Sequence, residues 1–169
     1  VMKLHGGAMA VEIERDRIRQ RTSRGRNAKA EQGFYVGHLK DGYIWELDEN
    51  EEKVIKIDPD REELIKNIYD MYLNKDMTTV EIRDFLNSNP EKYPSPNRYR
   101  YLHKTHFKGY RKDYKDRSGN IYSREDALWS DAMVCNIIRD EWYKGVRRFN
   151  GAKYSIDPIV DNDTWEECN

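Results

Sequence analysis

The alternation of hydrophobic and polar residues predicts a small β-hairpin followed by three short amphipathic helices. Apolar and polar residues alternate over 43–47 and again over 53–57, with an acidic run between them, which is typical of two paired strands. Apolar residues then recur at helical spacing over 61–74, over 79–88 and again after Ser130. These elements are those of one small, mainly helical domain.

Capping signals indicate where two of these helices begin. Thr78 and Glu81 have the spacing of a capping box, in which each side chain bonds the backbone N–H of the other residue. Ser130 is a suitable N-cap for the third helix, and Trp129 and Val134 occupy the two positions of a hydrophobic staple. The buried stripe of this helix is expected to comprise Val134, Ile137 and Ile138.

A second hairpin is predicted after the third helix. Asn150-Gly151 stands between two β-rich runs, 143–149 and 152–156, and a type I′ turn needs positive φ at both central residues. The order of helices followed by a hairpin makes a winged arrangement plausible. The predicted fold class is α+β, mainly α: an N-terminal helical arm plus a small helix-turn-helix or winged-helix-like domain with short antiparallel hairpins.

The third predicted helix carries candidate base-reading residues. Opposite its apolar stripe lie Ala132, Asn136 and Arg139, spaced i, i+4, i+7. Asparagine can bond bidentately to adenine, arginine can reach guanine or a phosphate, and alanine can contact a thymine methyl. This set is small and polar enough for a major groove, although an ordinary solvated helix face would look the same.

The segment over 10–32 predicts a helix that has few apolar side chains to bury in a core. Its apolar residues are sparse, and from Arg19 onward it is almost wholly polar. On a helical wheel the arginines form two stripes on roughly opposite sides, one with Arg17, Arg21 and Arg24 and the other with Arg15, Arg19 and Arg26. Two opposed stripes suit a rod with phosphates on both sides. The alternative is a solvated linker helix whose acidic residues pair locally, and Gly25 weakens the helix by about 1 kcal/mol relative to alanine.

Charge is segregated along the chain, although the whole carries a net charge of only −1. Residues 1–40 hold 9 basic and 4 acidic side chains, 41–90 hold 6 and 14, 91–128 hold 10 and 5, and 129–169 hold 5 and 8. Two basic blocks separated by an acidic one indicate a local polyanion-binding footprint. Solvation of exposed helices is the plainer explanation of such blocks.

The second basic block has an unusual composition. Between Arg98 and Arg117 lie 8 basic and 2 acidic residues, interleaved with five aromatic rings. Positive charge with rings that can stack is typical of polynucleotide contact. The alternative is a solvated insertion whose rings pack on the body. Ser118-Gly119-Asn120 is expected to close a ribbon between 110–114 and 121–122.

Composition excludes several classes of protein. With 169 residues and a mean hydropathy of −1.04, the chain has room for one ordinary domain plus an arm and shows no transmembrane run or apolar leader. Cys135 and Cys168 make neither a disulfide framework nor a zinc ribbon, and His103 and His106 have no placed thiol or carboxylate partner. We therefore expect no metal and no cofactor. The ends of the chain suggest a piece of a longer protein.

The chain resembles the large serine recombinases, the integrases and transposases of phages and mobile elements. Residues 12–22, with Gly25, 28–30 and Gly33, are similar to the end of the long helix that leaves the catalytic domain of these enzymes. The rest is similar to their recombinase domain through 68–69, 72–73, 79–82, 86–87, Trp129, Val134, 137–138, Tyr143, Gly145, 158–160 and 165–166. The resemblance covers about 8–167. It departs from the family at 37–43, where a glycine-rich turn is expected, and in a long connection between Asn87 and Trp129.

The resemblance implies the organisation and the role of the chain. Residues 1–33 would be the end of the long helix, which crosses the DNA, and 34–167 the DNA-binding recombinase domain, with a basic aromatic insertion at about 90–127. The family implies a double-stranded attachment site as partner, dimers or tetramers of the full-length parent, no membrane, and a bacterial or phage-encoded cytoplasmic protein. The function expected is sequence-specific DNA binding in integration, excision or inversion.

No catalysis is expected of the chain itself. These residues do not include the family's serine-bearing catalytic domain, and the serines present have no adjacent base in a recognisable spacing. A winged-helix transcription regulator and an RNA-binding module remain the alternatives. The predicted DNA-contacting residues are Arg15, Arg17, Arg19, Arg21, Arg24, Arg26 and Lys29 in the arm, Arg98, Arg100, Lys104, Lys108 and Arg111 in the insertion, and Ala132, Asn136, Arg139, Arg147, Arg148 and Lys153 in the remainder.

Overall fold

The computed structural model describes residues 5–32, 37–103, 111–115 and 118–169. The described chain divides into two compact units. The first comprises 1–38 with 148–152, and the second comprises 39–147 with 153–169. The second unit, which we call the head, holds most of the predicted elements and nearly all of the buried core.

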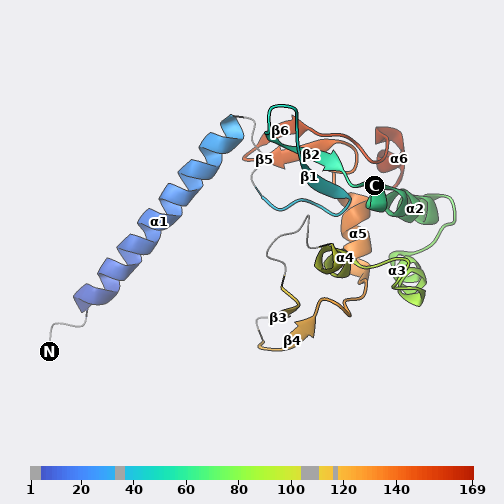
Figure 1. The fold of residues 1–169 in the computed structure, drawn as a ribbon, viewed down its shortest axis with the longest axis horizontal. Helices are drawn as coiled ribbons and strands as arrows, with labels where there is room; N and C mark the ends of the chain where they lie inside the picture. Colours follow the sequence, from blue (N-terminus) through green and yellow to red (C-terminus); the bar gives the residue numbers. More distant parts are fainter. Residues whose placement is uncertain (1–4, 33–36, 104–110, 116–117) are drawn as a thin grey trace. The chain divides into compact units, whose positions relative to one another are not determined.

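The arm is one continuous helix, α1 (His5–Glu31) (Figure 1). Its residues from Met9 to Gln20 are all exposed, as the scarcity of apolar residues predicts. The helix continues through Gly25, around which no atom lies within 4 Å of an added Cβ. The glycine therefore weakens the helix intrinsically without interrupting it.

The head begins with the predicted first hairpin and helix. Strands β1 (Tyr43–Leu47) and β2 (Lys53–Ile57) pair antiparallel, with Trp45 opposite Ile55. Helix α2 (Pro59–Leu73) follows at once, and the side chain of its N-cap Asp58 accepts from the Asp60 N–H at 3.1 Å. Proline at the first helical position supports this start because its fixed φ suits a helix and its missing N–H is not needed there.

Helices α2, α3 (Thr79–Ser88) and α5 (Asp131–Arg139) pack on one another around the core. The capping box at Thr78 is present, and the predicted N-cap of α5, Ser130, accepts from the Met133 N–H at 3.2 Å. The buried apolar side chains of the three helices are Leu64, Ile65, Ile68, Tyr69, Met71, Ile82, Leu86, Val134, Ile137 and Ile138. The predicted stripe of α5 is thus confirmed, and the fold class is α+β and mainly α.

The second predicted hairpin follows α5. Strands β5 (Val146–Phe149) and β6 (Ala152–Ser155) pair across Asn150 and Gly151. These two residues have φ of 48° and 80°, as a type I′ turn requires. A short helix that the periodicity did not predict, α6 (Asn162–Glu167), ends the described chain, and Trp165 donates from Nε1 to the Asp140 carbonyl at 3.2 Å.

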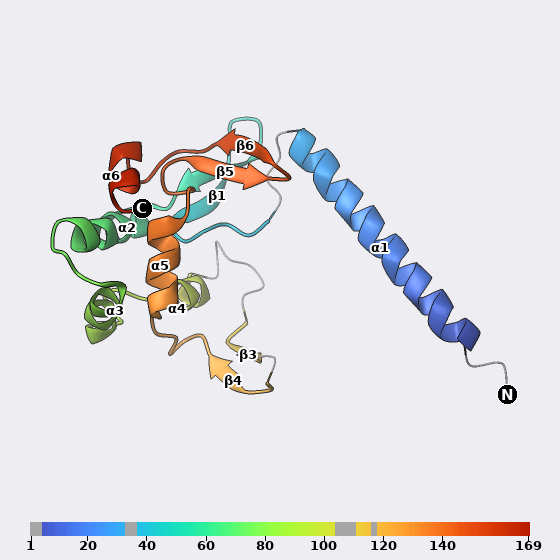
Figure 2. The same cartoon turned by 180° about the vertical axis from the view of Figure 1, so that it is seen from behind.

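The long connection between α3 and α5 contains structure of its own. Helix α4 (Pro96–Leu102) was not predicted, although Ser95 followed by Pro96 is the signal for its start. A ribbon of β3 (Asp113–Lys115) and β4 (Ile121–Ser123) lies close to the predicted positions. Figure 2 shows the ribbon beyond the end of α5 at which β4 joins that helix.

Candidate nucleic-acid interface

Helix α5 is held at both of its ends by hydrogen bonds from the other helices of the head. At its start, the backbone N–H of Trp129 donates to Asn87 Oδ1 at 2.9 Å, and Asn87 Nδ2 donates back to the Trp129 carbonyl at 3.0 Å. At its end, the Tyr69 hydroxyl donates to the Ile137 carbonyl at 2.8 Å. Burial raises the pKa of Tyr69, so this hydroxyl keeps its proton at neutral pH.

The opposite face of α5 is open to solvent. Ala132, Asn136 and Arg139 are all exposed, whereas Val134 is fully buried on the other side of the same helix. The structure therefore brings the three predicted base-reading residues together on one surface. Because the backbone of α5 is fixed at both ends, this surface has a defined orientation in the head.

The seven predicted basic residues of the arm are also exposed on α1. Because α1 is helical throughout, the two arginine stripes lie on opposite sides of it. Arg19 and Asp16 approach to 3.7 Å, and both side chains remain largely exposed. Such a surface pair is weak, so it leaves Arg19 able to bind a phosphate.

The structure separates the predicted basic residues of the second hairpin. Arg148 and Lys153 are exposed, but Arg147 is buried and its guanidinium lies 4.3 Å from the centroid of the Tyr154 ring. Successive side chains of a strand point to opposite faces, and in β5 the face that carries Arg147 is covered while the face that carries Arg148 is open. The predicted contact of Arg147 with DNA would require this side chain to leave its packed position on Tyr154.

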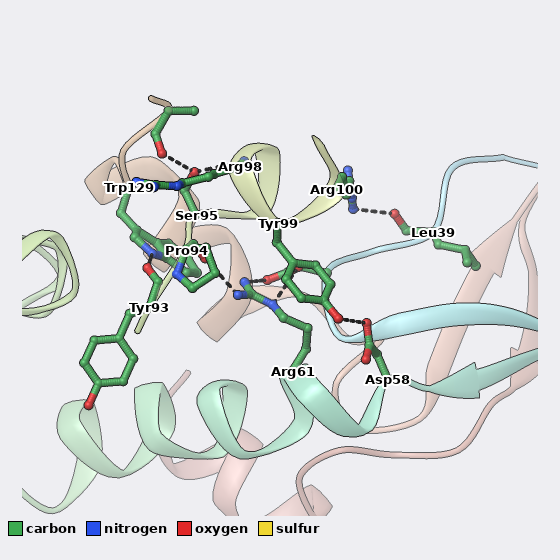
Figure 3. Close-up of polar contacts among 12 residues, drawn as sticks. Leu39, Asp58, Arg61, Tyr93, Pro94, Ser95, Arg98, Tyr99, Arg100 and Trp129 are labelled. Atoms are coloured by element: carbon green, nitrogen blue, oxygen red, sulfur yellow. Dashed lines mark hydrogen bonds and ion pairs between the residues drawn. The ribbon is translucent and has the colours of Figure 1, made fainter. Parts of the chain in front are cut away.

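The predicted basic residues of the insertion also differ in their surroundings. Arg98 forms an ion pair with Glu91, and Arg100 donates from Nη2 to the Leu39 carbonyl at 2.9 Å (Figure 3). Both arginines of α4 are partly buried; Arg98 pairs within the insertion, whereas Arg100 joins the insertion to the segment before β1. Arg111 is exposed beside the ribbon, whereas Lys104 and Lys108 lie outside the described residues, as does His106.

A buried polar network lies at the base of the insertion, where the sequence pattern predicted none. Arg61 donates from Nε to Asp41 at 3.2 Å and from Nη1 to the Pro94 carbonyl at 2.8 Å (Figure 3). Tyr99 of α4 donates to Asp58 at 2.9 Å, and its pKa is raised first by burial and then by this bond. No local pattern marks these residues, because they come from segments that only folding brings together.

The described residues give no sign of two other kinds of site. No group of three or more histidine, cysteine, aspartate and glutamate side chains among them is placed to hold a metal ion. Within the same ranges, every helix is either too short or too polar to cross a bilayer.

Comparison with known proteins supplies the family. Residues 59–169, more than half of the chain, match the model of the family described as Recombinase. The chain belongs to the recombinase family. The matched part of this recombinase begins with α2 and includes the insertion, α5 and the second hairpin. No curated protein and no solved structure matches the chain. The family resemblance drawn from the sequence is confirmed.

Proposed function

We propose that this recombinase chain binds double-stranded DNA in a sequence-specific manner, with α5 in the major groove. The supporting observation is the exposed face of Ala132, Asn136 and Arg139 on a helix whose other face is buried and whose ends are fixed. In a helix-turn-helix arrangement the second helix of the pair lies in the groove, and here α3 and α5 are the packed pair. The unusual feature is that the connection between them holds an entire insertion.

The chemistry of the α5 face suits base recognition. Asn136 can accept and donate at one adenine edge, and Arg139 in the last turn can reach guanine or a phosphate. Ala132 allows close approach and contact with a thymine methyl. Each well-formed bidentate pair is worth about 1–3 kcal/mol of discrimination against the wrong base.

The arm and the second hairpin would supply contacts that do not depend on sequence. Arginines on opposite sides of α1 allow it to cross a groove with a phosphate chain on each side. The exposed Arg148 and Lys153 on the hairpin are suited to the same kind of contact. Phosphate contacts set the position of a protein on the duplex, and base contacts then select the site.

We extend this proposal to the role in recombination. The chain would hold one half of an attachment site and so place a serine-bearing catalytic domain at the crossover point, while its own residues perform no strand chemistry. The parent would act as a dimer or tetramer in the cytoplasm of a bacterium, encoded by the cell or a phage. A site-specific integrase, transposase or invertase would all use the chain in this way.

The salt dependence of binding tests the proposed function on the full chain. Log K falls as log[salt] rises. In the arm variant Arg17→Gln/Arg21→Gln/Arg24→Gln this fall should be less steep, by about 0.9 in slope for each phosphate that the arm no longer neutralises. The control variant Lys53→Gln/Lys56→Gln/Lys66→Gln makes the same change of charge at exposed positions of β2 and α2. Equal slopes for the arm and control variants would favour a winged-helix regulator, and tighter binding to single-stranded RNA than to duplex DNA would favour an RNA-binding module.

A further inference from the structure

The β3–β4 ribbon presents an exposed column of aromatic rings and cations. Tyr114 and Tyr122 stand directly opposite each other in the ribbon, and their rings stack with centroids 5.4 Å apart. The guanidinium of Arg124 lies 5.1 Å from the centroid of the Tyr114 ring. The two tyrosines are nevertheless 38% and 45% exposed, so the packed column faces solvent instead of joining the core.

Cationic side chains surround this column. Arg111, Lys112 and Lys115 are all exposed. Lys112 contacts Glu125 at 2.8 Å, and the pKa of Lys112 is raised by that hydrogen bond, so the ammonium group stays charged. Both partners of this pair are about half exposed, and a pair of this kind is weak enough to be exchanged for a phosphate. Among the described residues 111–115 and 118–126, four basic side chains stand beside three acidic ones, Asp113, Glu125 and Asp126. The ribbon therefore presents several exposed cations and two phenol groups with a small excess of positive charge.

The end of the ribbon is fastened close to the start of α5. Ser95 donates from its hydroxyl to the Ala127 carbonyl at 2.7 Å, and Trp129 donates from Nε1 to the Tyr93 carbonyl at 2.8 Å. Trp129 is also the residue whose backbone N–H and carbonyl both form hydrogen bonds with the Asn87 side chain. Figures 1 and 2 both show β4 leading to the N-terminal end of α5. The ribbon and the first turn of α5 thus lie at the same end of the head.

We propose that the β3–β4 ribbon grips the phosphate backbone of the duplex beside the groove that α5 reads. Arg111, Lys112 and Lys115 pair with phosphates, and the hydroxyl of Tyr122 donates to a phosphate oxygen. Tyrosine hydroxyls and basic side chains are ordinary phosphate ligands in protein–DNA interfaces. This inference rests on the proposed function. It moves the DNA contact of the insertion from Arg98 and Arg100, whose partners are internal, to the ribbon.

The ribbon contributes affinity and register but no choice of sequence. Because the two rings stack on each other, one face of each is already occupied, and the hydroxyl groups remain as donors. Phosphate oxygens are the same at every base pair, so contacts from the ribbon stabilise all duplexes equally. Sequence selection stays with α5. The two surfaces therefore make separable contributions to binding.

The test uses the full chain and a random-sequence duplex of two helical turns, about 21 base pairs. The ribbon variant Arg111→Gln/Lys112→Gln/Lys115→Gln is compared with wild type and with the control variant Lys53→Gln/Lys56→Gln/Lys66→Gln. For the ribbon variant we expect the negative slope of log K against log[salt] to be less steep by about 2–3. We also expect binding to be weaker by about tenfold or more at low salt. Because all six positions are exposed, thermal unfolding should show both variants folded.

The outcomes separate this inference from the proposed function. A ribbon variant that binds like the control overturns the inference, while a loss of base preference in Asn136→Ala would still support reading by α5. No wild-type binding to any duplex overturns both. If a single strand of the same length binds more tightly than the duplex, and Tyr122→Ala abolishes that advantage, the ribbon stacks unpaired bases and the phosphate proposal is wrong. A less steep salt dependence in the ribbon variant, together with tighter binding of wild type to duplex than to single strand, supports the phosphate proposal.

Discussion

Arg61 and Asp41 form an ion pair inside the head, with their side chains only 1% and 6% exposed. The pair joins the first turn of α2 to the segment before β1. The same guanidinium lies 4.8 Å from the Tyr99 ring centroid of α4 and 5.6 Å from that of Trp129, which precedes α5. One buried cation thus contacts the elements that position the insertion and the proposed reading helix. Its several partners offset the cost of removing both charges from water.

Breaking this pair should strongly destabilise the head. Arg61→Met leaves Asp41 buried without its cation, and we expect a loss of about 3–5 kcal/mol in the free energy of unfolding. Lys66→Met is the matched control, because Lys66 pairs with Glu62 at 2.6 Å on the surface of α2. That change should cost less than about 1 kcal/mol. Urea unfolding followed by tryptophan fluorescence measures both, and similar losses would contradict a special role for the buried pair.

Removal of the side-chain amide at Asn136 should reduce the preference for particular base pairs more than it reduces affinity for duplexes of random sequence. We expect Asn136→Ala to lose about 1–3 kcal/mol of preference at one or two base pairs, because no other atom replaces the bidentate contact. Selection of binding sites from a random duplex library by wild type and by the variant measures this effect. Asn67→Ala, at an exposed position of α2, is the control and should select the same sites as wild type. Unchanged selection by Asn136→Ala would remove this residue from base reading.

Gly145 and Gly151 both have a left-handed backbone conformation, but only Gly145 has a close neighbour. Comparing their alanine variants therefore separates the cost of backbone strain from the cost of a steric clash. Gly145 has a φ of 88°, and an added Cβ would lie 2.9 Å from the Ile156 carbonyl oxygen; Gly151 has a φ of 80° and open space around it. Gly151→Ala should cost about 1–2 kcal/mol from backbone strain alone. Gly145→Ala should cost more, because the Ile156 backbone must also shift. Equal losses in thermal unfolding would show that the close contact relaxes freely.

The capping box of α3 should make stability depend on pH in acid. The Thr78 backbone N–H and hydroxyl both donate to the Glu81 carboxylate, at 2.8 Å each, and they lower its pKa below the ordinary 4.5. A lowered folded-state pKa contributes stability that is present above pH 4.5 and is lost as pH falls through the folded value. We expect Glu81→Ala to lower the melting temperature at pH 7, with the difference from wild type shrinking below pH 4.5.

A control variant identifies the source of that pH dependence. Glu49→Ala changes an exposed carboxylate in the turn between β1 and β2. Its melting temperature should differ little from wild type at either pH. A difference for Glu81→Ala that stays constant from pH 7 down to pH 3 would show that the carboxylate charge does not contribute to the cap.

Local patterns in the sequence predicted the helices and hairpins well where short-range chemistry decides them. The caps at Thr78 and Ser130 act within one helical turn, and the Asn150-Gly151 turn depends on the φ of two residues. Periodicity likewise identified the buried stripe of α5 and hence its exposed face. Helix α4 carried a comparable signal in Ser95-Pro96, but it has only seven residues, too few to show a clear helical periodicity, and it was not predicted.

By itself, the sequence determined which segments become helix or strand, which side of α5 is buried, and which residues are charged. Only the tertiary structure decided which charges are available to a partner. Arg98, Arg100 and Arg147 look like the other basic residues in sequence, but one pairs with Glu91, one with a backbone carbonyl, and one packs on Tyr154. Periodicity reports the short-range geometry of the backbone, whereas the partner of a long charged side chain depends on how the chain folds back on itself, within one hairpin for Arg147 and Tyr154 and across 61 residues for Arg100 and Leu39.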